Sequence, residues 1–381
     1  MKKLISAVAL SVTMPMICFA ESTVEELRIE KARKVIPSVV DRWEKDLNGF
    51  KRMWSSQTSS YAGAKALAET IGDYLWTESK ANMQDFDDRP LYWARLQAAE
   101  IFRIINPNFA LSEKQRLELV EILENSSRGR HDLEYLTDAP LKILITGFDP
   151  FLLDRNIEQG NPSGIAALLL DDQVIEYQGR RAEINSVIFP VRFEDFDRGE
   201  VETLLAPFYA LNSVDMVVTI SQGRSDFDLE RFPGRRRSSQ APDNLNKYIE
   251  GDKARPVISN VGRYGLQGPE FVEFSLPVKA MQQAKGKYQI NDNHGVETLE
   301  KGEFDARTLN ELAGSTAVQG GGGGYLSNEI SYRSIRLRNM LGSQIPTGHI
   351  HTPVLKKASP EQARPIFEQI KAMLERALPT L

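Results

Sequence analysis

Apolar residues recur at helical spacing through the first third of the chain. One such face is Val40, Trp43, Leu47, Phe50 and Trp54, and others follow near residues 67–75, 93–105 and 119–123. Capping-box spacing at residues 23–26 and 112–115 marks two helix starts. The pattern predicts a helical N-terminal domain or extension of about five helices over residues 21–138.

Aromatic residues concentrate in this helical part, at Trp43, Trp54, Tyr92 and Trp93. Large aromatic side chains most often fill a core, and their amphipathic rings also suit a sugar or partner surface. We expect core packing here, with a recognition surface as the alternative.

The pattern changes after Asp138. Short β-branched and apolar runs occur at residues 141–146, 186–191, 214–220 and 256–261, with helical stretches at 165–170 and 196–211. A final strand at 349–353 precedes a helix that starts at Ser359, whereas residues 282–315 have the composition of a loop or insertion. Alternating strands and helices predict an α/β domain over residues 139–381, a sheet with helices on both faces.

The first twenty residues have the features of a secretory signal. Lys2 and Lys3 precede an apolar run that ends in a small residue, Ala20, before Glu21. The run contains Pro15 and is too short for a lasting membrane span. We therefore expect cleavage after Ala20 and a periplasmic or secreted protein, with no stable membrane insertion.

Removal of this segment changes the chemistry that the chain can offer. It takes away Cys18, the only cysteine, and so excludes a cysteine nucleophile. It carries two of the 47 basic residues and none of the 52 acidic ones, so the mature chain has a formal charge of −7. An acidic chain gives no support to nucleic-acid binding.

A run of five glycines, residues 320–324, leads into a segment of helical periodicity that contains Ser327. Glycines allow a substrate to approach the backbone closely, and a helix start offers free N–H groups to a nucleophile and an oxyanion. The alternative is structural, because serine is a common N-cap residue and glycine runs are common linkers.

Four histidines are candidates for a general base. His131 falls in a polar linker and His294 in a loop, so we expect both to be solvated. His349 and His351 project from one side of a strand, where they suit either a base or a metal pair. No third ligand follows at a telling spacing, and no metal or organic cofactor is implied.

From Leu141 onward, five blocks occur in a family's order, and the chain resembles pyroglutamyl peptidase I, also called pyrrolidone-carboxylate peptidase. The blocks are residues 145–151 with 161–163, 189–191, 223–225 with 230–231 and 242–244, 274–277, and 325–328 with 350–353. The resemblance covers about 230 residues. It implies a peptidase that removes an N-terminal pyroglutamate, with a peptide or small amide as substrate.

The resemblance also implies residue roles. Glu230 matches the family's catalytic acid, His351 matches its base, and Ser327 takes the place of its cysteine. The resemblance implies that Phe148 and Phe151 line an apolar pocket near Gln222. We add Arg224 and Arg235, from the basic cluster described below, as expected substrate-binding residues. The structural alternatives are core packing for the two phenylalanines and a salt bridge with Arg231 for Glu230.

Several departures from the family bear on activity. Besides the serine, Leu152 replaces a glycine, the turn before Gly223 is about two residues shorter, and Arg235 replaces an asparagine. Arg224, Arg231 and residues 235–237 form a basic cluster that suits a carboxylate or phosphate. We expect a serine-type hydrolase. The alternatives are an inactive family member that binds an anionic peptide or cell-wall ligand, and a scaffold whose helical domain holds a partner.

Overall fold

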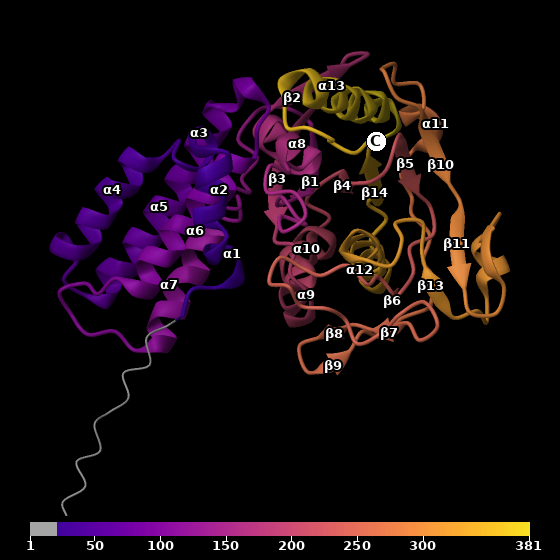
Figure 1. The fold of residues 1–381 in the computed structure, drawn as a ribbon. Coiled ribbons are helices and arrows are strands. Elements are labelled where there is room, and N and C mark those ends of the chain that lie inside the picture. Colours follow the sequence, from indigo (N-terminus) through magenta and orange to yellow (C-terminus); the bar gives the residue numbers. More distant parts are fainter. Residues whose placement is uncertain (1–20) are drawn as a thin grey trace, which may run out of the picture.

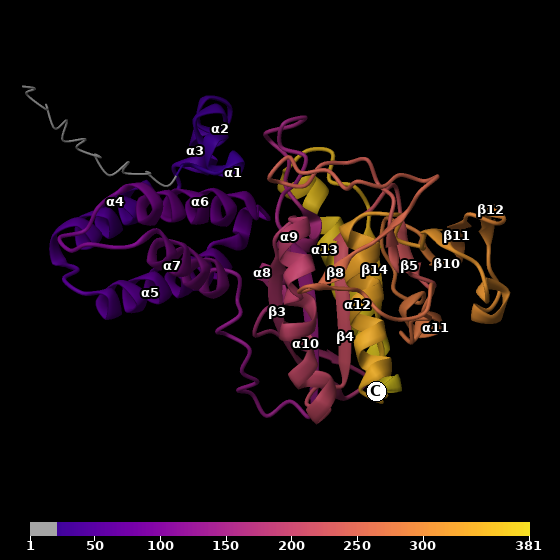
Figure 2. The ribbon, with the colours of Figure 1, turned by 90° about the horizontal axis from the view of Figure 1, so that it is seen from below.

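The computed structural model describes residues 21–381, so the predicted signal segment and its cleavage site lie outside the described residues. Helices make up the part before residue 127, and Figures 1 and 2 both place this helical region beside β3 and α8 of the α/β domain. The helices are α1 (Val24–Leu27), α2 (Ile29–Val35), α3 (Pro37–Val40), α4 (Glu44–Arg52), α5 (Tyr61–Ala81), α6 (Arg89–Ile104) and α7 (Glu113–Ser126).

The helical region is built on buried aromatic residues. Trp54 packs edge-on against Phe102 at 4.9 Å between ring centroids, and Trp43, Tyr92 and Trp93 are also buried. The aromatic residues therefore belong to the core rather than to a recognition surface. Both predicted capping boxes are present, at the starts of α1 and α7.

A seven-stranded sheet forms the centre of the α/β domain, in the order β10-β5-β14-β4-β1-β3-β2. β1 pairs in parallel with β3 and β4, β14 with β4, and β10 with β5, whereas β5 is antiparallel to β14 and β2 to β3. The strands are β1 (Leu141–Phe148), β2 (Val174–Tyr177), β3 (Arg180–Phe189), β4 (Met216–Gln222), β5 (Phe227–Glu230), β10 (Ile290–Asn293) and β14 (Thr347–Thr352).

Helices cover both faces of this sheet, as the alternation along β1 requires. Ile143 and Ile145 join a core with α8 (Pro162–Leu170) and α13 (Pro360–Ala377). Leu144 and Phe148 point the other way, into a core with α10 (Glu200–Leu211) and α12 (Leu326–Met340). The predicted fold class, an α/β sheet preceded by an all-α region, is confirmed.

Two predictions about strands are wrong. The stretch 282–315, predicted as a loop or insertion, is not a loop, because it contains the edge strand β10 and also β11 (Gly295–Thr298) and β12 (Gly302–Asp305), which form a small sheet with β13 (Ala317–Gln319). β10 and β12 lie at sheet edges, and β11 is the middle strand of the small sheet. All three are short and polar, so they lack the apolar signature of a central strand of the main sheet. The apolar run at 256–261 instead gives only β7 (Val257–Ile258) and β8 (Asn260–Val261), outside the main sheet.

Shorter elements complete the chain. The single helix predicted at 196–211 is two, because Gly199 adopts φ +88° between α9 (Phe193–Arg198) and α10. The others are α11 (Val278–Met281), β6 (Arg236–Arg237) and β9 (Tyr264–Gly265). Within residues 21–381, no helix combines the length and apolar character that a membrane crossing needs.

The helical region holds the loop that follows β1. Arg95 of α6 and Arg128, just after α7, both donate to the buried carboxylate of Asp149, at 2.9 and 2.6 Å. Asp88, at the start of α6, accepts the backbone N–H of Asn161, whose side chain in turn donates to the Asp149 carbonyl. Buried charges from the helical region thus fix the position of residues 149–161.

Candidate active site

Glu230 and His351 form a buried pair at the carboxyl ends of neighbouring strands. Glu230 ends β5 and His351 lies near the end of β14, and the Glu230 Oε1 to His351 Nδ1 distance is 2.6 Å. Both residues are buried. The alternative salt bridge between Glu230 and Arg231 is wrong, because Arg231 pairs with Asp292 at 2.6 Å and with Glu273.

Asn293 holds the second oxygen of the same carboxylate. Its Nδ2 donates to Glu230 Oε2 at 2.7 Å, and the register of β10 against β5 places the two residues side by side. The carboxylate is therefore fixed at both oxygens. Sequence reasoning missed Asn293, because residues 291–295 have the composition of a loop.

The glycine run is a tight buried turn rather than a linker. Gly320 and Gly323 exchange backbone hydrogen bonds of 3.0 and 2.9 Å. A Cβ on Gly321 would lie 2.4 Å from Glu230 Oε2, and one on Gly324 would lie 2.1 Å from Ser238 Oγ. The run lacks side chains because the backbone passes directly against the acid.

This close approach gives a test of the turn. Gly321→Ala should lower the free energy of unfolding by about 1–3 kcal/mol, since the new methyl group displaces the Glu230 carboxylate. Gly323→Ala meets open space and should cost only about 1 kcal/mol, from its φ of +85°. Urea unfolding of the two variants checks the order, and equal losses would mean that Gly321 does not press on the acid.

Ser327 is the second residue of α12. The N-cap is Tyr325, so the interpretation of Ser327 as an N-cap serine is wrong. Its hydroxyl donates to the Gly322 carbonyl at 3.1 Å, and the described residues give it no hydrogen bond to His351. The backbone N–H groups of residues 326–328, in the first turn of α12, have no hydrogen-bond acceptor among residues 21–381. They are therefore free to bind an oxyanion.

A small pocket opens beside Ser327, at the carboxyl ends of β1 and β4. Phe148 lines this pocket and stacks on Phe196 with ring centroids 6.1 Å apart, so it belongs to the core and to the pocket. The lining residues are Phe148, Phe151, Asn161, Val191, Ser221, Gln222, Tyr325, Leu326 and Ser327. Leu152 follows the lining residue Phe151 and stands where the resemblance expects glycine. Its backbone has a left-handed φ of +57°, a conformation that glycine adopts readily.

His349 is a buried neutral partner of His351. Its Nδ1 lies 2.8 Å from Thr219 Oγ1 and its Nε2 lies 2.8 Å from Ser221 Oγ, with the two imidazole rings 5.0 Å apart. Burial, followed by the neighbouring His351, lowers the pKa of His349 well below its ordinary 6.5. Because hydroxyl groups engage both nitrogens, His349 is not free to form a metal pair.

The lowered pKa of His349 makes stability depend on pH. Below pH 6.5 the unfolded chain takes up a proton that the buried imidazole does not, so acid should destabilise the fold. The free energy of unfolding of the wild type should fall more steeply than that of His349→Gln, by up to about 1.4 kcal/mol per pH unit. Urea unfolding from pH 7 to pH 5 measures this difference, and parallel curves would contradict it.

The arginines of the basic cluster are mostly engaged with acids. Arg235 donates to Glu270 and to the Gly268 carbonyl, and Arg236 shares the same carboxylate. Arg237 pairs with the buried Glu329. Arg235 does not line the pocket, and its guanidinium points to Glu270 instead. Arg224 is exposed in the turn after β4, and its side chain has no hydrogen bond or ion pair among residues 21–381.

Two domain models match the chain. One, described as the PA0049 N-terminal domain, matches residues 11–124, and the other, the PA0049 C-terminal domain, matches residues 142–267 and 306–356. Both parts of the chain match the PA0049 family. The match to the C-terminal domain model leaves out residues 268–305, the stretch that contains Asn293.

The chain is also similar to individual proteins. Uncharacterized protein PA0049 of Pseudomonas aeruginosa is 29% identical, and the match covers 78% of this chain and 71% of that protein. Among solved structures, a mutant pyrrolidone carboxyl peptidase from Pyrococcus furiosus has a TM-score of 0.44 and 22% identity, and covers 63% of this chain and 100% of that one. A second structure of the same peptidase has a TM-score of 0.43 and 21% identity, over 63% and 99%.

Proposed function

We propose that this protein is an exported serine-type hydrolase that cleaves an amide bond, N-terminal pyroglutamyl or related. Ser327 is the nucleophile, His351 the general base and Glu230 the acid that orients it. The observation that carries the proposal is the Glu230 carboxylate, fixed by Asn293 on one oxygen and placed 2.6 Å from His351 Nδ1 on the other. A carboxylate only accepts hydrogen bonds, so the proton belongs on Nδ1, and Nε2 is left free to accept.

In the proposed reaction, the Ser327 hydroxyl turns from the Gly322 carbonyl toward His351 Nε2. This step requires rotation about χ1 of Ser327 away from the Gly322 carbonyl, and catalytic hydrogen bonds are often loose before substrate binds. As Oγ attacks the carbonyl carbon, its proton passes to Nε2, and the free N–H groups at the start of α12 bind the oxyanion. The protonated His351 then donates to the leaving amine, and water hydrolyses the ester by the reverse sequence.

The pocket favours a small uncharged acyl group. Phe148, Phe151 and Val191 supply apolar walls. The Gln222 Oε1 accepts from the Leu355 N–H at 2.9 Å, which leaves the Gln222 amide N–H groups for a carbonyl of the substrate. This combination fits a lactam ring better than a charged side chain, in keeping with the sequence resemblance.

Export is part of the proposal and rests on the signal features of residues 1–20 alone. The mature enzyme would act in the periplasm or outside the cell, where the absence of a thiol is no disadvantage. A serine nucleophile retains its reactivity under oxidising conditions that inactivate a cysteine.

Hydrolysis of a fluorogenic pyroglutamyl amide by purified residues 21–381 tests the proposal. Turnover by the wild type, with Ser327→Ala as the blank, is the expected result. Silence of the wild type with activity in Ser327→Cys would contradict the serine chemistry and favour a binding role for an intact pocket. Silence in both would contradict the pyroglutamyl specificity and direct the search to other amides.

A further inference from the structure

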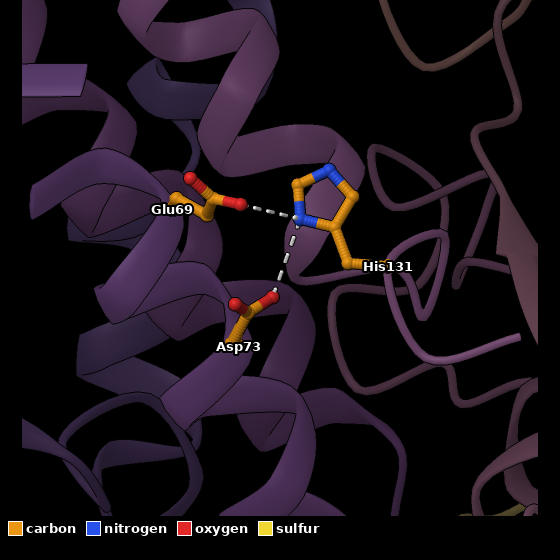
Figure 3. A group of neighbouring side chains, drawn as sticks. All are labelled: Glu69, Asp73 and His131. Carbon is orange, nitrogen blue, oxygen red and sulfur yellow. Dashed lines mark ion pairs between the residues drawn. The ribbon is translucent and has the colours of Figure 1, made fainter. Parts of the chain in front are cut away.

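Three potential metal ligands meet on the helical region, far from Ser327 in the sequence (Figure 3). Glu69 and Asp73 are four residues apart on α5, so their side chains lie on one face of the helix. His131 comes from the segment after α7 and points its Nδ1 between the two carboxylates. One ligand atom from each residue lies within 4.8 Å of both others.

The spacing of these atoms fits ion pairs but is too long for direct hydrogen bonds. His131 Nδ1 lies 3.6 Å from Glu69 Oε1 and 3.5 Å from Asp73 Oδ1, beyond the normal range of an N–H···O hydrogen bond. A tetrahedral ion with bonds of about 2.0–2.1 Å holds its ligand atoms about 3.3–3.4 Å apart. The observed distances are therefore close to the edges of a tetrahedral metal site.

A second acidic group gives an internal comparison. Asp132, Asp171 and Asp172 also gather within reach of one another, but Lys80 Nζ lies 2.6–2.7 Å from all three. The ammonium group already neutralises that cluster. No lysine or arginine pairs with Glu69 or Asp73 among the described residues. His131 is the one residue there that forms an ion pair with these carboxylates.

We infer that Glu69, Asp73 and His131 bind a zinc ion, with water at the fourth position. One imidazole and two carboxylates form a ligand set that zinc accepts, whereas calcium and magnesium prefer oxygen ligands alone. All three side chains are between 39% and 56% exposed, so the ion has access from solvent and keeps a water ligand. This inference does not depend on the reaction proposed at Ser327.

The ion would fasten the connection between the two parts of the protein. His131 follows Arg128 by three residues, and Arg128 holds Asp149 next to the pocket wall. Zinc would tie this segment back to α5 and oppose its separation from the helices. Because zinc would bind the folded state preferentially, it should raise the melting temperature.

The test uses residues 21–381 stripped of metal with a chelator and titrated calorimetrically with zinc chloride. The wild type should bind an ion that His131→Gln does not, and Asp73→Asn should bind it at least about tenfold more weakly. Glu134→Gln is the matched control, because Glu134 is an exposed acid in the same segment and has no partner among residues 21–381. Its titration should equal that of the wild type.

Cobalt provides a second measurement. Cobalt in a tetrahedral site absorbs strongly in the visible range, so this band should appear with the wild type and be absent with His131→Gln. Equal zinc binding by the wild type and His131→Gln would overturn the inference. An ion lost only in His351→Gln would overturn it too, because the ion would then lie in the candidate active site. Equal melting temperatures of the metal-free proteins would show that the variants are folded.

Discussion

Replacing Glu230 by glutamine should lower kcat by about 10³–10⁴-fold with little change in the fold. Asn293 Nδ2 donates to one oxygen of this side chain, so the glutamine will turn its own oxygen toward Asn293. Its NH₂ group then faces His351 Nδ1 and donates to it. That hydrogen bond moves the imidazole proton to Nε2, where it blocks proton transfer from Ser327.

Asp228→Asn is the matched control for this experiment. Asp228 lies two residues earlier on β5 and is the residue opposite His351 in the strand register, but its carboxylate accepts from Asn291. Its replacement should change kcat only a few-fold. Steady-state kinetics on the hydrolysed amide measure both variants, and a similar loss in each would mean that Glu230 contributes only charge near the site rather than a specific tautomer.

Asp149→Asn should cost about 3–5 kcal/mol of the free energy of unfolding. Arg95 and Arg128 are both buried and both donate to this carboxylate, so the amide leaves two guanidinium groups without their shared counter-charge. The loss should affect Arg95 more than Arg128, because burial and the neighbouring Arg128 already lower the pKa of the Arg95 guanidinium. Urea unfolding followed by tryptophan fluorescence measures the effect.

Asp154→Asn tests whether burial is the cause. Asp154 lies in the same loop and also pairs with an arginine of the helical region, Arg28, but its side chain is 50% exposed. Arg28 is buried but also donates to the Asn244 carbonyl and to Asn246 Oδ1, so the loss of this half-exposed carboxylate should cost about 1 kcal/mol or less. Losses of equal size in the two variants would contradict the argument, because any contact between the two parts would then be worth the same.

Much of the fold could be predicted because its central elements have strong periodic patterns. β1 and β4 are buried on both faces and contain long apolar runs, and the starts of α1 and α7 contain capping boxes. β10 could not be predicted in this way. Its sequence is Ile-Asn-Asp-Asn, and it forms a strand only because β5 offers it an unpaired edge.

The residues of the candidate site were likewise predicted only in part. The sequence resemblance placed Ser327, His351 and Glu230 in a common region, and the structure brings the last two into contact. Asn293 was missed because its strand was missed, and the role of Arg235 could not be foreseen because its partner, Glu270, is 35 residues away. Side-chain partners of this kind depend on tertiary packing and leave no local pattern.

The position of β14 has a consequence for how the protein folds during synthesis. This strand is the last of the sheet in sequence, yet it lies between β4 and β5. Until the ribosome has released residues 347–352, one edge of β4 remains unpaired. The pair formed by β5 and β10 also lacks the strand through which it joins the rest of the sheet. The sheet therefore cannot be completed until residues up to 352 have been synthesised. Because His351 arrives on that same strand, the nascent protein acquires its proposed general base in the step that completes its core.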